Sequence, residues 1–172
     1  MLAGLAPTTG RAATLDQLKG HSFEISLTRV IQFRDAGKPI QQQWMYRVYV
    51  GQAGTVFDYT RYDLGPAGSG GGANAISPDH AASLPWGRMK AWDMQGGNLT
   101  KLLQQPEGIL VETITVDPTV STCTFSLQGR PDPTTRHLVL QTPQGVRREV
   151  VSIGVATYVC TVKQGNVFAT DR

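Results

Sequence analysis

Long apolar runs and clustered basic residues are both missing from this sequence of 172 residues. No run reaches the roughly 18 apolar residues that a transmembrane helix needs, so we expect no membrane-spanning helix. The net charge is only +3, and lysine and arginine form no stripe of the kind that binds nucleic acid. We therefore expect neither a membrane span nor a nucleic-acid partner.

Histidine and cysteine are also scarce, with three and two copies. His21, His80 and His137 lie far apart and show none of the short spacings that bring two histidines to one metal ion. Two cysteines without a C-x-x-C pair cannot make a zinc site alone. We expect no metal and no cofactor, and we interpret each histidine as exposed or hydrogen-bonded.

The two cysteines bear on the cellular compartment. Cys123 and Cys160 lie in segments that resemble strands, STCTFSL and ATYVCTV. One disulfide between neighbouring strands is the favoured hypothesis, and two buried free thiols are the alternative. Residues 1–13 resemble the end of a signal peptide that starts further upstream, or else form a flexible arm. Both features favour a periplasmic or secreted protein.

Turn-forming residues are abundant, with 19 glycines and 10 prolines, while 40% of the residues are hydrophobic and 17% are charged. This composition is typical of a folded protein with many turns. Turn signals recur about every 8–12 residues, the spacing expected of an all-β sandwich or barrel, and one of them predicts a tight turn at residues 95–98. The last two predicted strands are Val146 to Ile153 and Val155 to Val162. We predict a single all-β domain over residues 14–172, an antiparallel barrel of about eight strands.

The most regular stretch covers residues 43–63, with the sequence QWMYRVYVGQAGTVFDYTRYD. Aromatic and β-branched residues alternate with period two on both sides of a turn at Gly51 to Gly54, which predicts a β-hairpin. Neither face of this hairpin is purely polar, so we expect contacts on both sides, as in the wall of a barrel whose lumen is partly filled. A short helical turn over Thr14 to Gly20 precedes a strand over Ser22 to Phe33, whose apolar face Arg29 interrupts.

A segment rich in small residues follows the hairpin, LGPAGSGGGANAISPDHAASLP at residues 64–85. It is long for a connection in one domain, so we interpret it as a lid over a pocket or as a mobile loop. No Gly-Lys-Ser/Thr follows its glycines, which excludes a phosphate-binding loop of the common type. Asp79 and His80 form either an acid–base pair at a pocket mouth or a simple turn.

Three segments, LDQLKGHSFEISL, YVGQAGTVFDY and CTVKQGNVFA, resemble a group of small exported alphaproteobacterial proteins with paired cysteines and a cysteine-to-GNVF ending. The resemblance covers both ends and the hairpin, and it implies export and a disulfide but no catalytic residue. A looser likeness is to calycin-type barrels such as the lipocalins, in which a helical turn leads into the first strand. Gly20-His21-Ser22 lacks the tryptophan of the lipocalin Gly-x-Trp signature, so this likeness implies architecture alone.

Aromatic and cationic residues supply the best candidate for a binding pocket, because rings offer apolar contact and arginine holds anionic groups. Glu112 adds a carboxylate in the apolar strand Ile109 to Val116 and needs a partner such as Arg47, Arg61 or Arg88. The alternative is that the aromatic residues are core packing and Glu112 forms an internal salt bridge. The candidate ligand-binding residues are Trp44, Tyr46, Arg61, Tyr62, Trp86, Arg88, Trp92 and Glu112.

Three functions are compatible with these patterns. The leading hypothesis is a non-enzymatic, exported barrel that binds a small amphipathic or anionic molecule. The second is an isomerase or cyclase in which Glu112 and Tyr46 transfer protons within the lumen. The third is a protein that assembles with itself or with partners through its sheet edges.

Overall fold

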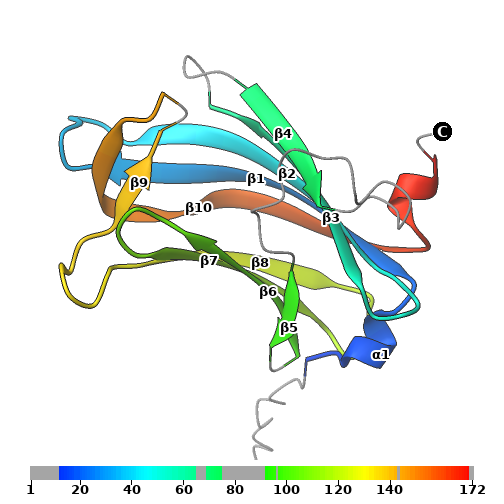
Figure 1. Ribbon diagram of the computed structural model, residues 1–172. Helices are drawn as coiled ribbons and strands as arrows, with labels where there is room; N and C mark the ends of the chain where they lie inside the picture. The colour runs from blue at the N-terminus through cyan, green and yellow to red at the C-terminus, as the bar shows by residue number, and fades with distance from the viewer. Residues whose placement is uncertain (1–11, 65–68, 75–91, 96, 143, 171–172) are drawn as a thin grey trace, which may run out of the picture.

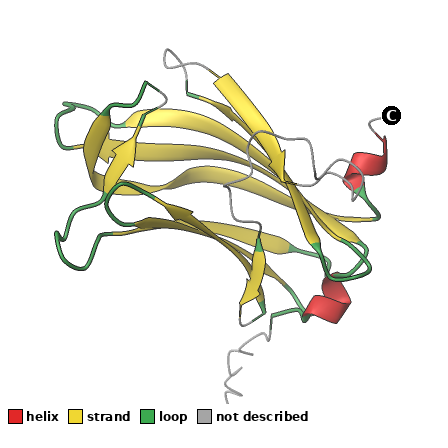
Figure 2. Cartoon of the chain, in the orientation of Figure 1, coloured by secondary structure: helices red, strands yellow, loops and turns green. Residues whose placement is uncertain are grey.

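The computed structural model describes residues 12–64, 69–74, 92–95, 97–142 and 144–170. Within these residues the chain forms ten strands in two antiparallel sheets and only two short helical segments (Figure 1; Figure 2). The all-β prediction is therefore confirmed.

The larger sheet has the strand order β4-β3-β2-β1-β10-β9 and curls around one side of the molecule (Figure 1). β1 is a central strand, paired with β2 on one side and with β10 on the other. The strands of this sheet are β1 (His21–Phe33), β2 (Ile40–Val50), β3 (Val56–Asp63), β4 (Ser69–Asn74), β9 (Val139–Gln141) and β10 (Arg147–Gln164).

The smaller sheet lies below the larger one in Figure 1 and has the order β5-β6-β7-β8. Its strands are β5 (Asp93–Gln95), β6 (Asn98–Gln104), β7 (Ile109–Val116) and β8 (Cys123–Arg130). Gln95 of β5 pairs with Asn98 of β6, as the predicted tight turn requires, and Gly97 has the positive φ (86°) that favours glycine.

The two sheets approach most closely where β8 lies beside β10. A Cβ atom on Gly129 would stand 2.8 Å from the Ile153 side chain, so glycine is needed there. No hydrogen-bonded ladder between β8 and β10 occurs in the described part of the chain, where an isolated bridge of Glu107 with Val139 joins the sheets instead. The structure is a curled half-barrel with a second sheet, and the predicted closure into an eight-stranded barrel is not confirmed.

The helical turn predicted near the start is α1 (Leu15–Leu18). A capping box begins it, in which the Gln17 side chain accepts a hydrogen bond from the Thr14 backbone N–H at 2.8 Å. Ala13 is buried, and its N–H donates to the Val116 carbonyl oxygen at 2.9 Å. The chain is thus fixed to the smaller sheet from Ala13 onward, while residues 1–11 of the predicted arm lie outside the described residues.

Two strands differ from the sequence predictions. β4 forms inside the segment predicted as a lid or loop. It pairs with β3 through backbone hydrogen bonds, which do not depend on the identity of the side chains. A Cβ on Gly70 would stand 2.6 Å from the Tyr62 hydroxyl oxygen, which favours the glycine-rich sequence. The rest of that segment, residues 65–68 and 75–85, lies outside the described residues. β10 runs unbroken through Gly154, where the sequence predicted two strands.

The hydrophobic core lies between the two sheets. Alternate residues of β1 point into it, as the period-two pattern predicted, and β7 and β8 cover it from the other side. Phe168 of the C-terminal 3₁₀ turn (Val167–Thr170) is buried as well. The main contributors are Phe23, Ile25, Leu27, Ile31, Phe33, Val48, Leu99, Leu110, Ile114, Val116, Phe125 and Leu127.

Candidate functional site

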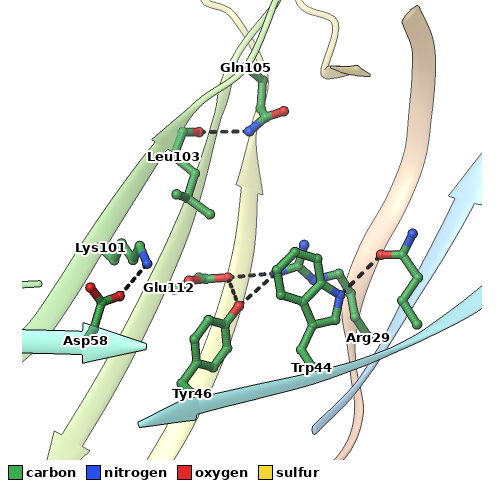
Figure 3. A network of polar contacts seen from close by, with 9 residues as sticks. Arg29, Trp44, Tyr46, Asp58, Lys101, Leu103, Gln105 and Glu112 are labelled. Carbon is green, nitrogen blue, oxygen red and sulfur yellow. Dashed lines mark hydrogen bonds and ion pairs between the residues drawn. The ribbon is translucent and has the colours of Figure 1, made fainter. Parts of the chain in front are cut away.

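Glu112 lies between the two sheets and is fully buried, as its apolar strand predicted. Its Oε1 accepts a hydrogen bond from Tyr46 Oη at 2.6 Å and one from Arg29 Nη2 at 2.7 Å (Figure 3). The same Arg29 nitrogen also donates to the Tyr46 hydroxyl at 3.2 Å. Three side chains, one each from β1, β2 and β7, therefore contact one another in a triangle inside the molecule.

The cation that neutralises Glu112 is Arg29, which was not among the partners predicted from the sequence. Arg47 instead contacts Glu24, at 3.2 Å, and Arg61 is exposed. Arg88 lies outside the described residues. The signal for Arg29 was present, since it interrupts the apolar face of β1, and a residue on that face must point into the core.

A second buried ion pair lies beside the first. Lys101 Nζ of β6 is 2.7 Å from Asp58 Oδ2 of β3, and both side chains are buried (Figure 3). Lys101 is also directly opposite Glu112 in the ladder between β6 and β7. Lys101 could not be predicted as buried, because β6, NLTKLLQ, buries residues of both faces near its centre and shows no clean alternation.

Aromatic rings surround both ion pairs. The ring centroid of Tyr46 lies 5.7 Å from that of Phe125 and 5.9 Å from that of Trp92. The Lys101 ammonium is 5.8 Å from the Tyr46 ring centroid and 5.7 Å from that of Trp92. The half-buried Trp44 covers the Arg29 guanidinium at 4.0 Å, and Trp44 contacts Tyr62 with centroids 5.0 Å apart. The rings thus form a row from half-buried to fully buried positions.

Five buried side-chain atoms in this region have no hydrogen-bond partner among the described residues. One of these atoms is on Thr60, which is directly opposite Tyr46 in the ladder between β2 and β3 and so points to the same side of the sheet. A buried polar group left unpaired costs about 1–3 kcal/mol, so folded proteins contain few of them. The atoms are Arg29 Nε, Asp58 Oδ1, Thr60 Oγ1, Trp92 Nε1 and Glu112 Oε2.

We call the residues Arg29, Tyr46, Asp58, Thr60, Trp92, Lys101 and Glu112 the buried polar cluster. Each is less than 5% exposed, and together they come from strands of both sheets and from Trp92, just before β5. Three of the residues predicted for a ligand site belong to it, namely Tyr46, Trp92 and Glu112. Trp44 and Tyr62 lie at its half-buried margin.

The hydroxyl of Tyr46 is held in its neutral form. Burial, together with the nearby Glu112 carboxylate, raises the pKa of Tyr46 well above its usual value of 10. At neutral pH this side chain is therefore a hydrogen-bond donor, and it does not act as a base.

We expect one of the five tyrosines to ionise only when the protein unfolds. Because the folded-state pKa of Tyr46 is raised, its stabilising contribution is complete below about pH 10 and is lost as the pH rises further. Phenolate absorbance during alkaline titration measures this directly. Tyr46→Phe should remove the late-ionising group, whereas Tyr158→Phe, at an exposed position, should leave that late phase in place. A late phase that persists in Tyr46→Phe would contradict the buried geometry.

Of the remaining predicted residues, Arg61 is described and lies outside the cluster. Arg61 lies across from Met45, one position along from the inward-facing Thr60, so it belongs to the outer face of the larger sheet. There it lines an open groove of about 210 Å³ with Ser26, Gln43, Trp44, Met45, Tyr62 and Asp63. Trp86 lies outside the described residues, as Arg88 does.

Two of the three histidines lie within the described residues, and each contacts an oxygen atom. His21 Nδ1 is 3.2 Å from the Lys19 carbonyl oxygen, and His137 Nδ1 is 2.7 Å from Glu149 Oε1. His80, with its partner Asp79 in the predicted acid–base pair, lies outside the described residues. Within the described ranges no group of three or more histidine, cysteine, aspartate or glutamate side chains is placed to hold a metal ion.

The predicted disulfide is confirmed. Cys123 of β8 is bonded to Cys160 of β10, with a Cα–Cα distance of 5.6 Å, and so it links the two sheets. No helix in the described part of the chain is long and apolar enough to cross a membrane. The resemblance to exported alphaproteobacterial proteins and the likeness to calycins stay predictions, because no family model, no curated protein and no solved structure matches this chain.

Proposed function

We propose that this protein binds a small amphipathic molecule at the buried polar cluster and does so without catalysis. The observation that carries the proposal is the set of five buried, unpaired polar atoms beside aromatic rings. A ligand that hydrogen-bonds to these atoms would remove their desolvation cost, while the rings contact its apolar part. The row from Tyr62 and Trp44 to Tyr46 gives such a molecule apolar contact on the way to the cluster.

Binding is better supported than proton transfer by Tyr46 and Glu112. The Tyr46 hydroxyl stays protonated, because its pKa is raised by burial. Both carboxylates of the cluster are already engaged with a cation at 2.7 Å, Glu112 with Arg29 and Asp58 with Lys101. Each carboxylate charge in the cluster is thus neutralised by a cation, and the second oxygen of each carboxylate is available to accept a hydrogen bond from a ligand.

The proposed compartment is the periplasm or the cell exterior. A disulfide that links strands of two sheets is stable in an oxidising environment and rare in the cytosol. The proposal also agrees with the resemblance of the first residues to the end of a signal peptide.

Native mass spectrometry of protein purified from an exporting host tests the proposed function. We expect an additional mass that remains under gentle conditions and leaves on unfolding. Thr60→Val should lower the retained fraction while raising the free energy of unfolding by about 1 kcal/mol, because valine keeps the shape and removes an unpaired hydroxyl. Thr161→Val, at an exposed position of β10, should change neither. Protein that carries no additional mass, with Thr60→Val no more stable than wild type, would overturn the proposal.

A second candidate is assembly between copies of this chain. Its supporting observation is the row of exposed apolar side chains on β10, since Val151 and Val159 are 59% and 65% exposed. The same spectra distinguish the two candidates, because assembly gives multiples of the 18.6 kDa chain mass instead of a small increment.

A further inference from the structure

The formal charges of the buried polar cluster balance. Arg29 and Lys101 contribute two positive charges, and Asp58 and Glu112 contribute two negative ones, each held in a pair at 2.7 Å. All four side chains are buried, with exposures from 0% to 4%. A charged ligand group would add an uncompensated charge to a buried site that is already neutral, which is strongly unfavourable.

The unpaired atoms require both donors and acceptors from a ligand. Arg29 Nε and Trp92 Nε1 can only donate, whereas Asp58 Oδ1 and Glu112 Oε2 can only accept. The Thr60 hydroxyl can do either. A carboxylate or phosphate would bring only acceptors, and its oxygens would meet the two carboxylate oxygens of the cluster. An ammonium or amidinium group would bring only donors and would meet the guanidinium and indole N–H groups.

On the basis of the proposed function, we infer that the polar part of the ligand is uncharged and carries both hydrogen-bond donors and acceptors, as amides and hydroxylated groups do. This narrows the sequence-based expectation of an amphipathic or anionic ligand. The rings of Tyr46 and Trp92, set edge to face with centroids 5.9 Å apart, favour a flat or apolar part next to that polar group.

Three planar probes of nearly equal size separate the possibilities, namely benzamide, benzoate and benzamidinium. They differ in the charge and in the donors and acceptors of one group, while the ring stays the same. Binding to the purified chain at pH 7 is measured by ligand-observed NMR and calorimetry, after any retained molecule has been removed by unfolding and refolding. We expect benzamide to bind at least about tenfold more tightly than either ion. Trp92→Phe, which removes one donor, should weaken benzamide binding if the probe occupies the cluster.

Charge-altering variants make the test specific to the cluster. Glu112→Gln leaves the cluster with one net positive charge and should shift the preference toward benzoate. Asp58→Asn, which removes the other negative charge, serves the same purpose if Glu112→Gln does not fold. Glu24→Gln is the matched control, because Glu24 pairs with Arg47 and Lys163 outside the cluster and its loss should leave the order of the three probes unchanged.

The outcomes distinguish this inference from the proposed function. Tighter binding of benzoate or benzamidinium by the wild-type chain, weakened by Trp92→Phe, would overturn the uncharged polar group and leave binding at the cluster intact. Equal binding of all three probes, or binding that Trp92→Phe does not change, would also overturn it. Failure of all three probes, combined with an absence of retained mass from the exporting host, would overturn the proposed function itself.

Discussion

Replacing Glu112 with leucine is expected to lower the free energy of unfolding by about 3–5 kcal/mol, because it leaves a buried charge without a partner. Arg29 is 4% exposed, and Glu112 is the acidic group paired with it among the described residues. The same substitution removes the acceptor of the Tyr46 hydroxyl. Urea unfolding followed by tryptophan fluorescence measures the change.

Matched variants separate the cost of leaving Arg29 unpaired from the cost of changing the Glu112 side chain itself. The double variant Glu112→Leu/Arg29→Met removes both charges and should recover most of the loss, since apolar replacements of buried pairs are often neutral. Glu24→Leu breaks an ion pair with a half-buried partner and should cost about 0–1 kcal/mol. A Glu112→Leu loss no greater than that of Glu24→Leu would show that Arg29 and Glu112 do not meet inside the protein.

Removing the disulfide is expected to have an effect of similar size. Cys160 lies 37 positions after Cys123, and for a loop of that length the loop-entropy relation gives a loss of about 4 kcal/mol for the double alanine variant. Urea unfolding of the wild-type protein with and without reductant should show the same difference, and reduction should raise the mass by two hydrogens.

The double alanine variant is also the control for reductant effects elsewhere in the protein. Its unfolding curve should not respond to reductant, since the chain contains two cysteines only. A wild-type mass and unfolding curve that are both insensitive to reductant would show that the two thiols are not joined.

The local elements of the fold could be predicted from the sequence, because their signals lie within single segments. The alternation around Trp44 and Phe57 predicted the β2–β3 hairpin, and the apolar run at Ile109–Val116 predicted β7 with the bounds it has. A capping threonine predicted α1. The break predicted between two strands at Gly154 was wrong, because pairing with β1 holds β10 in one continuous strand across it.

The candidate site was predicted in part. Tyr46 and Glu112 were expected together inside the molecule, and their side chains are 2.6 Å apart. Their partner Arg29 lies 83 positions before Glu112 in the chain, and Asp58 lies 43 positions before Lys101. Pairings over such separations depend on how the two sheets face each other, and no local pattern encodes that arrangement.

The pairing of β1 with β10 has a consequence for how the chain folds as it is made. Thirteen residues of β1 pair with residues 150–164, so β1, at the centre of the larger sheet, lacks one neighbour until those residues have been synthesised. Contacts between segments far apart in the sequence are slow to form, because a long loop must close first. The chain therefore stays incompletely folded during synthesis. That delay agrees with the export proposed above, because a chain that crosses a membrane before it folds would pair β1 with β10 only afterwards.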